Sequence, residues 1–127
     1  MSRLVHPIAK ARGLGSAKDG VRHWWLQRVT AVALALLVPW FVYLVVSLVG
    51  ADYLTVRLTL SQPITAALLA VFVGALFWHV QLGLQVVIED YIHARGLEVA
   101  LQIAVRFACV FAAVVAFIAI GRLAFAA

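Results

Sequence analysis

The stretch WHVQLGLQVVIEDYIH, from Trp78 to His93, carries polar side chains inside and at the end of a long apolar run. His79 lies deep in the run, whereas Asp90 and Tyr91 lie at its edge. Eleven residues separate His79 from Asp90. In an α-helix this spacing gives a net rotation of about 20° and a rise of about 16 Å. The two side chains are therefore expected on one helix face, at different depths.

His79 is the first candidate for chemistry, because ionisable groups within a membrane are costly and usually functional. If the helix is centred near Leu76 or Phe77, His79 lies close to the bilayer midplane, and Gly83 follows one turn later on the same face. A neutral imidazole beside a residue without a side chain suits an axial ligand of a heme iron. The other interpretation is a histidine that hydrogen-bonds to a carbonyl of a neighbouring helix.

The remaining histidines lie in different surroundings. His6, His23 and His93 fall in the N-terminal tail or at the membrane interface, where solvated polar residues are expected. No second histidine of the chain lies at the depth of His79. A heme with two histidine ligands would therefore take its other ligand from another chain, and this count predicts an oligomer.

Asp90 and Tyr91 have two interpretations. A tyrosine hydroxyl at the membrane edge can donate a hydrogen bond to a ligand carbonyl, and an adjacent carboxylate can hold a partner arginine or exchange protons. The alternative is an ordinary helix end with solvated side chains. Arg28, at the start of the first apolar run, suits a heme propionate or a lipid phosphate. Arg106, within the third run, either snorkels to the surface or pairs with a buried acid.

The composition defines the class of protein. Of the 127 residues, 66% are hydrophobic and only 12% are charged, against roughly 25% charged in soluble domains. Three apolar runs, at about 29–49, 63–90 and 99–120, are long enough to cross a bilayer as helices. We therefore expect an all-α integral membrane protein, with a basic tail at 1–23 and a three-helix domain at 24–127. Cys109 is the only cysteine and is expected to be a small core residue.

Basic residues predict the orientation of the chain. Six precede the first span and one lies in the first loop, 50–62. The six are Arg3, Lys10, Arg12, Lys18, Arg22 and Arg28, and the one is Arg57. This bias places the N-terminus in the cytoplasm, the second loop, 89–98, on the same side, and the C-terminus outside. A largely irregular tail, a bend at Pro39 and a helix C-cap at Gly96 are also expected.

Two motifs carry a family resemblance. GVRHWWLQRVTAVAL, from Gly20 to Leu34, combines a basic lead-in with an Arg-x-Thr-Ala helix start, and HVQLGLQVVIEDY, from His79 to Tyr91, places Asp-Tyr eleven residues after a histidine. With these motifs and the three-span layout, the chain resembles the smaller hydrophobic membrane-anchor subunits of succinate dehydrogenase, the succinate:quinone oxidoreductase of respiratory complex II.

The resemblance implies a role for each candidate residue. His79 matches an axial ligand of heme b, which is shared with a histidine of a larger cytochrome b anchor subunit. Tyr91 matches a tyrosine that hydrogen-bonds a ubiquinone carbonyl, and Asp90 the acid beside it, which supports a quinone-site arginine of the partner. Arg28 matches an arginine near the heme propionates. Some relatives have a histidine two residues after the glycine, where this chain has Arg22 followed by His23. Either of these two residues is expected to approach a propionate.

The resemblance also implies the partners and the location. A non-catalytic anchor is expected to bind the larger anchor subunit, the iron–sulfur subunit, the flavoprotein subunit and membrane lipid, and no nucleic acid. The chain has neither a glycine motif for a flavin nor a cysteine set for iron–sulfur clusters. The expected location is the bacterial inner membrane, with the mitochondrial inner membrane as the alternative. Two other functions remain open: a homodimeric b-type cytochrome that uses His79 twice, and a heme-free assembly or transport module.

Overall fold

The computed structural model describes residue 8 and residues 17–125 of the chain, of which 17–19 are described by their backbone alone. Four helices make up the continuous part: α2 (Ala17–Ser47), α3 (Tyr53–Ser61), α4 (Pro63–Tyr91) and α5 (Arg95–Phe125). No strand occurs among the residues described, so the expected all-α class is confirmed. The basic and histidine positions at 3, 6, 10 and 12 of the expected tail lie outside this part of the chain.

Three of the helices are long and apolar enough to cross a membrane. They span Gly20–Ser47, Pro63–Tyr91 and Arg95–Phe125, with 28, 29 and 31 residues. At 1.5 Å per residue each exceeds a hydrocarbon core of about 30 Å. The chain is therefore a multi-pass membrane protein, as the three apolar runs predicted.

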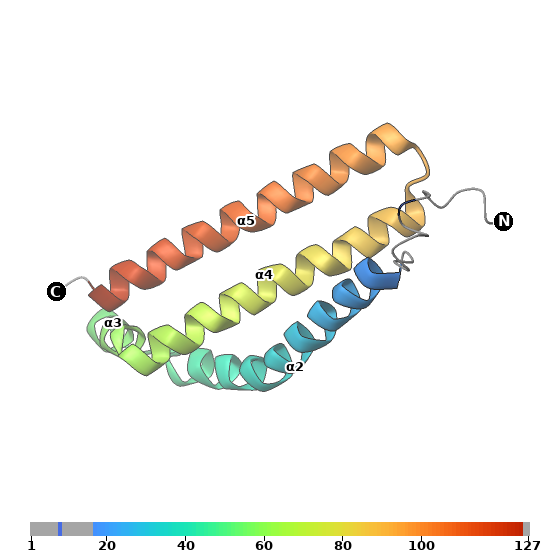
Figure 1. Ribbon diagram of the computed structural model, residues 1–127. Helices are drawn as coiled ribbons and strands as arrows, with labels where there is room; N and C mark the ends of the chain where they lie inside the picture. Colours follow the sequence, from blue (N-terminus) through green and yellow to red (C-terminus); the bar gives the residue numbers. More distant parts are fainter. Residues whose placement is uncertain (1–7, 9–16, 126–127) are drawn as a thin grey trace.

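The long helices form an open layer with α4 in the middle (Figure 1). α4 packs against α2 on one side and α5 on the other, and among the described residues α2 and α5 do not contact each other. Five of the seven most buried apolar residues lie on α4. They are Ala66, Leu69, Phe72, Leu82 and Ile88, and the other two are Leu44 and Cys109. Cys109 is thus the small core residue that was expected.

Close packing fixes α4 against both neighbours. The ring of Phe72 on α4 stacks on Phe41 of α2, with centroids 4.5 Å apart and planes at 18°. On the other side, a β-carbon built on Gly74 would lie 3.6 Å from the ring of Phe117 on α5. Small and flat side chains at these points allow the helices to approach, as is common between membrane helices.

The helix ends differ from expectation in three places. α2 begins at Ala17, so residues 17–23 are helical and not irregular. The loop 50–62 contains the nine-residue helix α3, and the second loop shrinks to 92–94 because α4 ends at Tyr91 and α5 begins at Arg95. The expected C-cap at Gly96 is wrong: α4 is capped by Ile92, and Gly96 lies in the first turn of α5.

The connection between α2 and α4 has a clear local cause. Gly50 adopts a φ of +78°, which a residue without a β-carbon adopts at little cost. Asp52 then precedes α3 and its carboxylate accepts a hydrogen bond from the hydroxyl of Thr55, which lowers the pKa of Asp52 below its usual value. Pro63 opens α4 in the first turn, where its missing N–H costs nothing. α2 remains continuous through Pro39 and is visibly bent (Figure 1).

Candidate functional site

The first candidate site lies in the seam between α2 and α4. His79 is half-buried there, and its Nδ1 lies 3.0 Å from the hydroxyl oxygen of Thr30 on α2. Thr30 lies on the face of α2 that packs on α4, one helical turn after Leu26. The histidine thus hydrogen-bonds to a neighbouring helix, as one interpretation of the sequence expected, but to a side-chain hydroxyl instead of a carbonyl.

Two further polar side chains of α2 occupy this seam. His23 and Gln27 are both half-buried, and each has a buried polar atom without a hydrogen-bond partner: Nε2 of His23 and Oε1 of Gln27. With Thr30 they follow a spacing of four and three residues, which places them on one helix face. Gln27 was not a candidate from the sequence, although this spacing of polar residues in an apolar helix was a signal for it.

Gly83 borders the same seam. A β-carbon built on Gly83 would lie 3.9 Å from Nε2 of Gln27, which is an ordinary contact distance. Within this chain, the space beside Gly83 therefore faces the amide of Gln27.

The seam between α2 and α4 offers part of what a heme requires. No group of three or more His, Cys, Asp or Glu side chains that could hold a metal ion occurs in the described part of the chain. A heme iron needs only one protein ligand from this chain. Hydrogen bonding within the described residues engages only Nδ1 of His79, so its Nε2 has a lone pair or a proton with no protein partner. His79 and the unpartnered Nε2 of His23 therefore fit a ligand with one metal centre and polar groups.

The basic residues near the start of α2 are exposed. Arg22 and Arg28 both point away from the core, and the guanidinium of Arg28 lies 5.5 Å from the ring centroid of Trp24. Trp24 and Trp25 are themselves exposed and meet edge to face at 5.5 Å. This arrangement is typical of an interfacial aromatic belt with attendant arginines.

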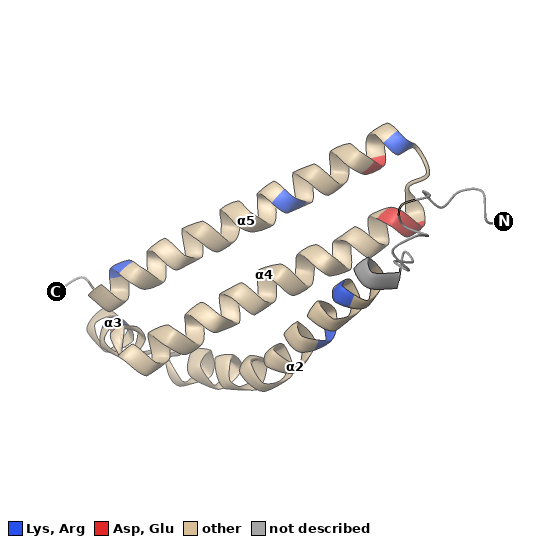
Figure 2. Ribbon diagram, viewed as in Figure 1, with Lys and Arg blue, Asp and Glu red and all other residues tan. Residues whose placement is uncertain are grey.

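The second candidate site is the end of α4. Asp90 and Tyr91 occupy its last turn and are exposed, with 76% of Tyr91 accessible. Figure 2 shows the acidic end of α4 beside the start of α2, where the arginines of that helix lie. Asp90 and Tyr91 therefore lie at the same end of the layer as the basic lead-in, and both are free to meet another chain or a ligand.

A polar cluster beside this end was not predicted. Oε1 of Glu89 accepts hydrogen bonds from the amides of Gln85, at 2.9 Å, and Gln102, at 3.4 Å. Gln102 also donates to Glu98, which lies 4.0 Å from Arg95. These contacts link α4 to α5. The carboxylate of Glu89 therefore accepts hydrogen bonds within the chain, whereas that of the neighbouring Asp90 accepts none from the described residues.

Arg106 lies in the same α4–α5 seam. Together with Gln81, Gln85 and Gln102 it lines a small gap, and its side chain is exposed. Among the described residues it forms no ion pair. The described residues therefore contain no pair between Arg106 and a buried acid.

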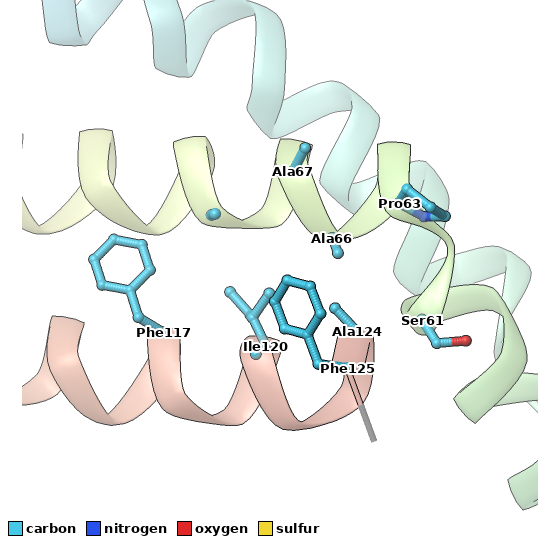
Figure 3. A pocket seen from close by; sticks show the side chains of 10 residues that line it. Ser61, Pro63, Ala66, Ala67, Phe117, Ile120, Ala124 and Phe125 are labelled. Carbon is cyan, nitrogen blue, oxygen red and sulfur yellow. The ribbon is translucent and has the colours of Figure 1, made fainter. Parts of the chain in front are cut away.

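An apolar groove beside α5 lies far from both candidate sites. It has a volume of about 380 Å³ and lies between the start of α4 and the end of α5 (Figure 3). Pro63, Ala66, Phe117 and Phe125 are among its lining residues, and it contains no titratable side chain among those described. The groove offers no group for proton or metal chemistry.

Together these features define a class: a three-span helical membrane protein with a histidine deep in its middle span and a polar helix end. Residues 2–120 match the family described as the succinate dehydrogenase/fumarate reductase transmembrane subunit. The match covers most of the chain, and the chain belongs to this family.

Known relatives agree with this assignment. A protein of Rickettsia bellii is 41% identical over 99 residues, which cover 78% of this chain and 79% of the relative. One of Rickettsia conorii is 39% identical over 112 residues (87% and 88%), and one of Paracoccus denitrificans is 33% identical over 105 residues (83% and 81%). All three are named succinate dehydrogenase hydrophobic membrane anchor subunit. No solved structure matches the chain.

The relatives confirm the family resemblance that the two motifs predicted. They also confirm the expected kind of protein, because they are anchor subunits, which are non-catalytic parts of an enzyme complex.

Proposed function

We propose that this chain is the small membrane anchor of a succinate:quinone oxidoreductase, with His79 as one axial ligand of a heme b and with Tyr91 and Asp90 in a ubiquinone site. The observation that carries the finer part of the proposal is the state of His79. Its ring is held between two transmembrane helices through Nδ1, while Nε2 has no partner among the described residues. A merely packed histidine would gain from a second hydrogen bond at this depth.

The heme would be shared with another chain. When bound, a bis-histidine heme accepts and donates single electrons. His79 supplies one ligand nitrogen, and the larger cytochrome b anchor supplies the other. His23, Arg22 and Arg28 lie at one end of α2, where imidazole N–H and guanidinium groups suit the propionate carboxylates. The unpartnered Nε2 of His23 is the strongest of these three candidates.

The quinone site would lie at the end of α4. The hydroxyl of Tyr91 donates a hydrogen bond to a ubiquinone carbonyl, and the carboxylate of Asp90 holds an arginine of a partner subunit by a charge-assisted hydrogen bond. Both side chains are exposed in the single chain, so partner subunits complete the pocket. Glu89 does not take this role because its carboxylate already accepts hydrogen bonds from Gln85 and Gln102.

The proposed orientation follows the basic residues. The start of α2 and the end of α4 lie at one end of the layer (Figures 1 and 2), and the six basic residues before the first span support a cytoplasmic location for that end. The quinone site then faces the side on which the flavoprotein and iron–sulfur subunits dock. All three relatives given above are bacterial, which favours the bacterial inner membrane over the mitochondrial one.

The test is purification of the native complex through an affinity tag on this chain, from membranes in mild detergent. The proposal predicts a flavoprotein, an iron–sulfur protein, a second and larger anchor, and heme b. A heme protein containing only copies of this chain would favour the homodimeric cytochrome. A chain that purifies without heme and without these partners would favour the assembly or transport module.

A further inference from the structure

The contact between Thr30 and His79 determines which ring nitrogen carries hydrogen. Besides its 3.0 Å distance to Nδ1 of His79, the Thr30 hydroxyl lies 2.7 Å from the carbonyl oxygen of Leu26 and 3.1 Å from that of Gln27. A hydroxyl has one proton to donate and lone pairs to accept with. The carbonyl of Leu26 can only accept, and it offers the shortest of the three contacts.

The direction of the hydrogen bonds follows from this count. The Thr30 proton goes to the carbonyl of Leu26, a back-bond within the helix that threonine commonly makes. The oxygen therefore turns a lone pair to His79, and Nδ1 must carry the hydrogen and donate it. A neutral imidazole with hydrogen on Nδ1 has its free lone pair on Nε2.

We propose that Thr30 is a positioning residue that fixes the ring orientation and the tautomer of His79, so that Nε2 is the nitrogen presented to a metal. The inference rests on the proposed function, in which His79 binds a heme iron. Two hydrogen bonds in series, from Nδ1 to Oγ1 and from Oγ1 to the Leu26 carbonyl, reinforce each other. They make Nε2 a stronger electron donor, as outer hydrogen bonds to ligating histidines do.

The test compares four variants in the purified complex. Thr30→Val keeps the shape of the side chain but replaces the hydroxyl with a methyl group. Thr30→Ala removes both the hydroxyl and the methyl group, and Thr30→Ser retains the hydroxyl. Thr59→Val is the matched control, because the hydroxyl of Thr59 on α3 makes the same kind of back-bond, 2.9 Å to the carbonyl of Thr55, without meeting a histidine. The readouts are the midpoint potential of the heme, the g-values of its oxidised form and the heme-to-flavin ratio.

The expected result is an upward shift of the midpoint potential and displaced g-values in Thr30→Val and Thr30→Ala, because a less electron-rich ligand stabilises ferric iron less. Thr30→Ser and Thr59→Val should match the wild type. Wild-type potentials and g-values in Thr30→Val would overturn the inference. Failure of both Val and Ala variants to assemble, with Thr59→Val assembled, would also overturn it, since losing one neutral hydrogen bond on the ligand should not abolish the complex.

Different results would disprove the proposed function and the inference about Thr30. If His79→Ala keeps the wild-type heme spectrum in an assembled complex, His79 is not the ligand. If His79→Ala changes the spectrum and Thr30→Val does not, His79 remains the ligand and only the role of Thr30 is lost.

Discussion

The rings of Phe41 on α2 and Phe72 on α4 are stacked with their planes 18° apart and their centroids 4.5 Å apart, in the same seam that holds His79. Phe72 is 8% exposed, and His79 follows it by seven residues, two turns along the helix. The stack therefore fixes how α2 lies against the face of α4 that carries the histidine. In lipid, packing of this kind holds helices together in place of the hydrophobic effect.

Phe72→Ala should lower the thermal stability of the purified complex. An aromatic pair is worth about 0.5–1.5 kcal/mol beyond the area that it buries, and the cavity left behind adds to the loss. The measurement is the midpoint of thermal unfolding in detergent. Phe125→Ala is the control, because that ring is 90% exposed at the end of α5. Equal midpoints for the two variants would mean that the stack does not hold the seam.

The C-terminus is predicted to lie outside the cytoplasm, from the six-to-one bias of basic residues around the first span. Alkaline phosphatase fused after residue 127 should be active, and a fusion that ends the chain after Ala94, between α4 and α5, should be inactive. The reverse pattern would invert the orientation and place Asp90 and Tyr91 on the outer side.

Tyr91→Phe should lower quinone reduction while heme content and folding survive, since only a hydroxyl is removed. Losing a hydrogen bond in a pocket largely free of water costs about 1–3 kcal/mol, or about fivefold or more in quinone-linked turnover or affinity. The measurement is the ratio of quinone-linked to dye-linked succinate oxidation in membranes.

Tyr53→Phe is the control for this ratio, because Tyr53 is equally exposed, at 77%, and belongs to α3. If Tyr91→Phe leaves both the ratio and the quinone affinity at the control values, Tyr91 is only an interfacial aromatic.

Asp90→Asn should act in the same direction, by loosening the partner arginine that the carboxylate holds. Glu89→Gln is its matched control: the same chemical change one residue earlier, on a side chain that already bonds to Gln85 and Gln102 of this chain. We expect a lower quinone-linked ratio for Asp90→Asn than for Glu89→Gln. A larger defect in Glu89→Gln would move the functional acid to Glu89.

The sequence predicted the spans well because hydropathy and helical rise determine them. The run expected at 63–90 is α4, Pro63–Tyr91. Helix α3 was missed, since nine residues with little apolar excess resemble a loop to a hydropathy argument. The C-cap at Gly96 was wrong because glycine also occurs in the first turn of a helix, here α5.

The candidate site was harder to predict in detail. A helix in lipid is apolar on all faces, so its sequence does not reveal which face meets which neighbour. His79 could be singled out as an ionisable residue at membrane depth, but its partner Thr30 is 49 positions away. The polar residues His23 and Gln27 lie on the face of α2 that carries Thr30, but only the packing of α2 against α4 shows that this face meets the helix of His79.

The most direct test of the central claim is the heme spectrum of the complex that carries His79→Ala. His93→Ala, a change on an exposed histidine between α4 and α5, is the control. We expect the loss of one axial bond in His79→Ala to remove or alter the low-spin spectrum of the dithionite-reduced complex, and the spectrum of His93→Ala to be unchanged. An unchanged low-spin spectrum in a fully assembled His79→Ala complex would contradict the assignment of His79 as the ligand.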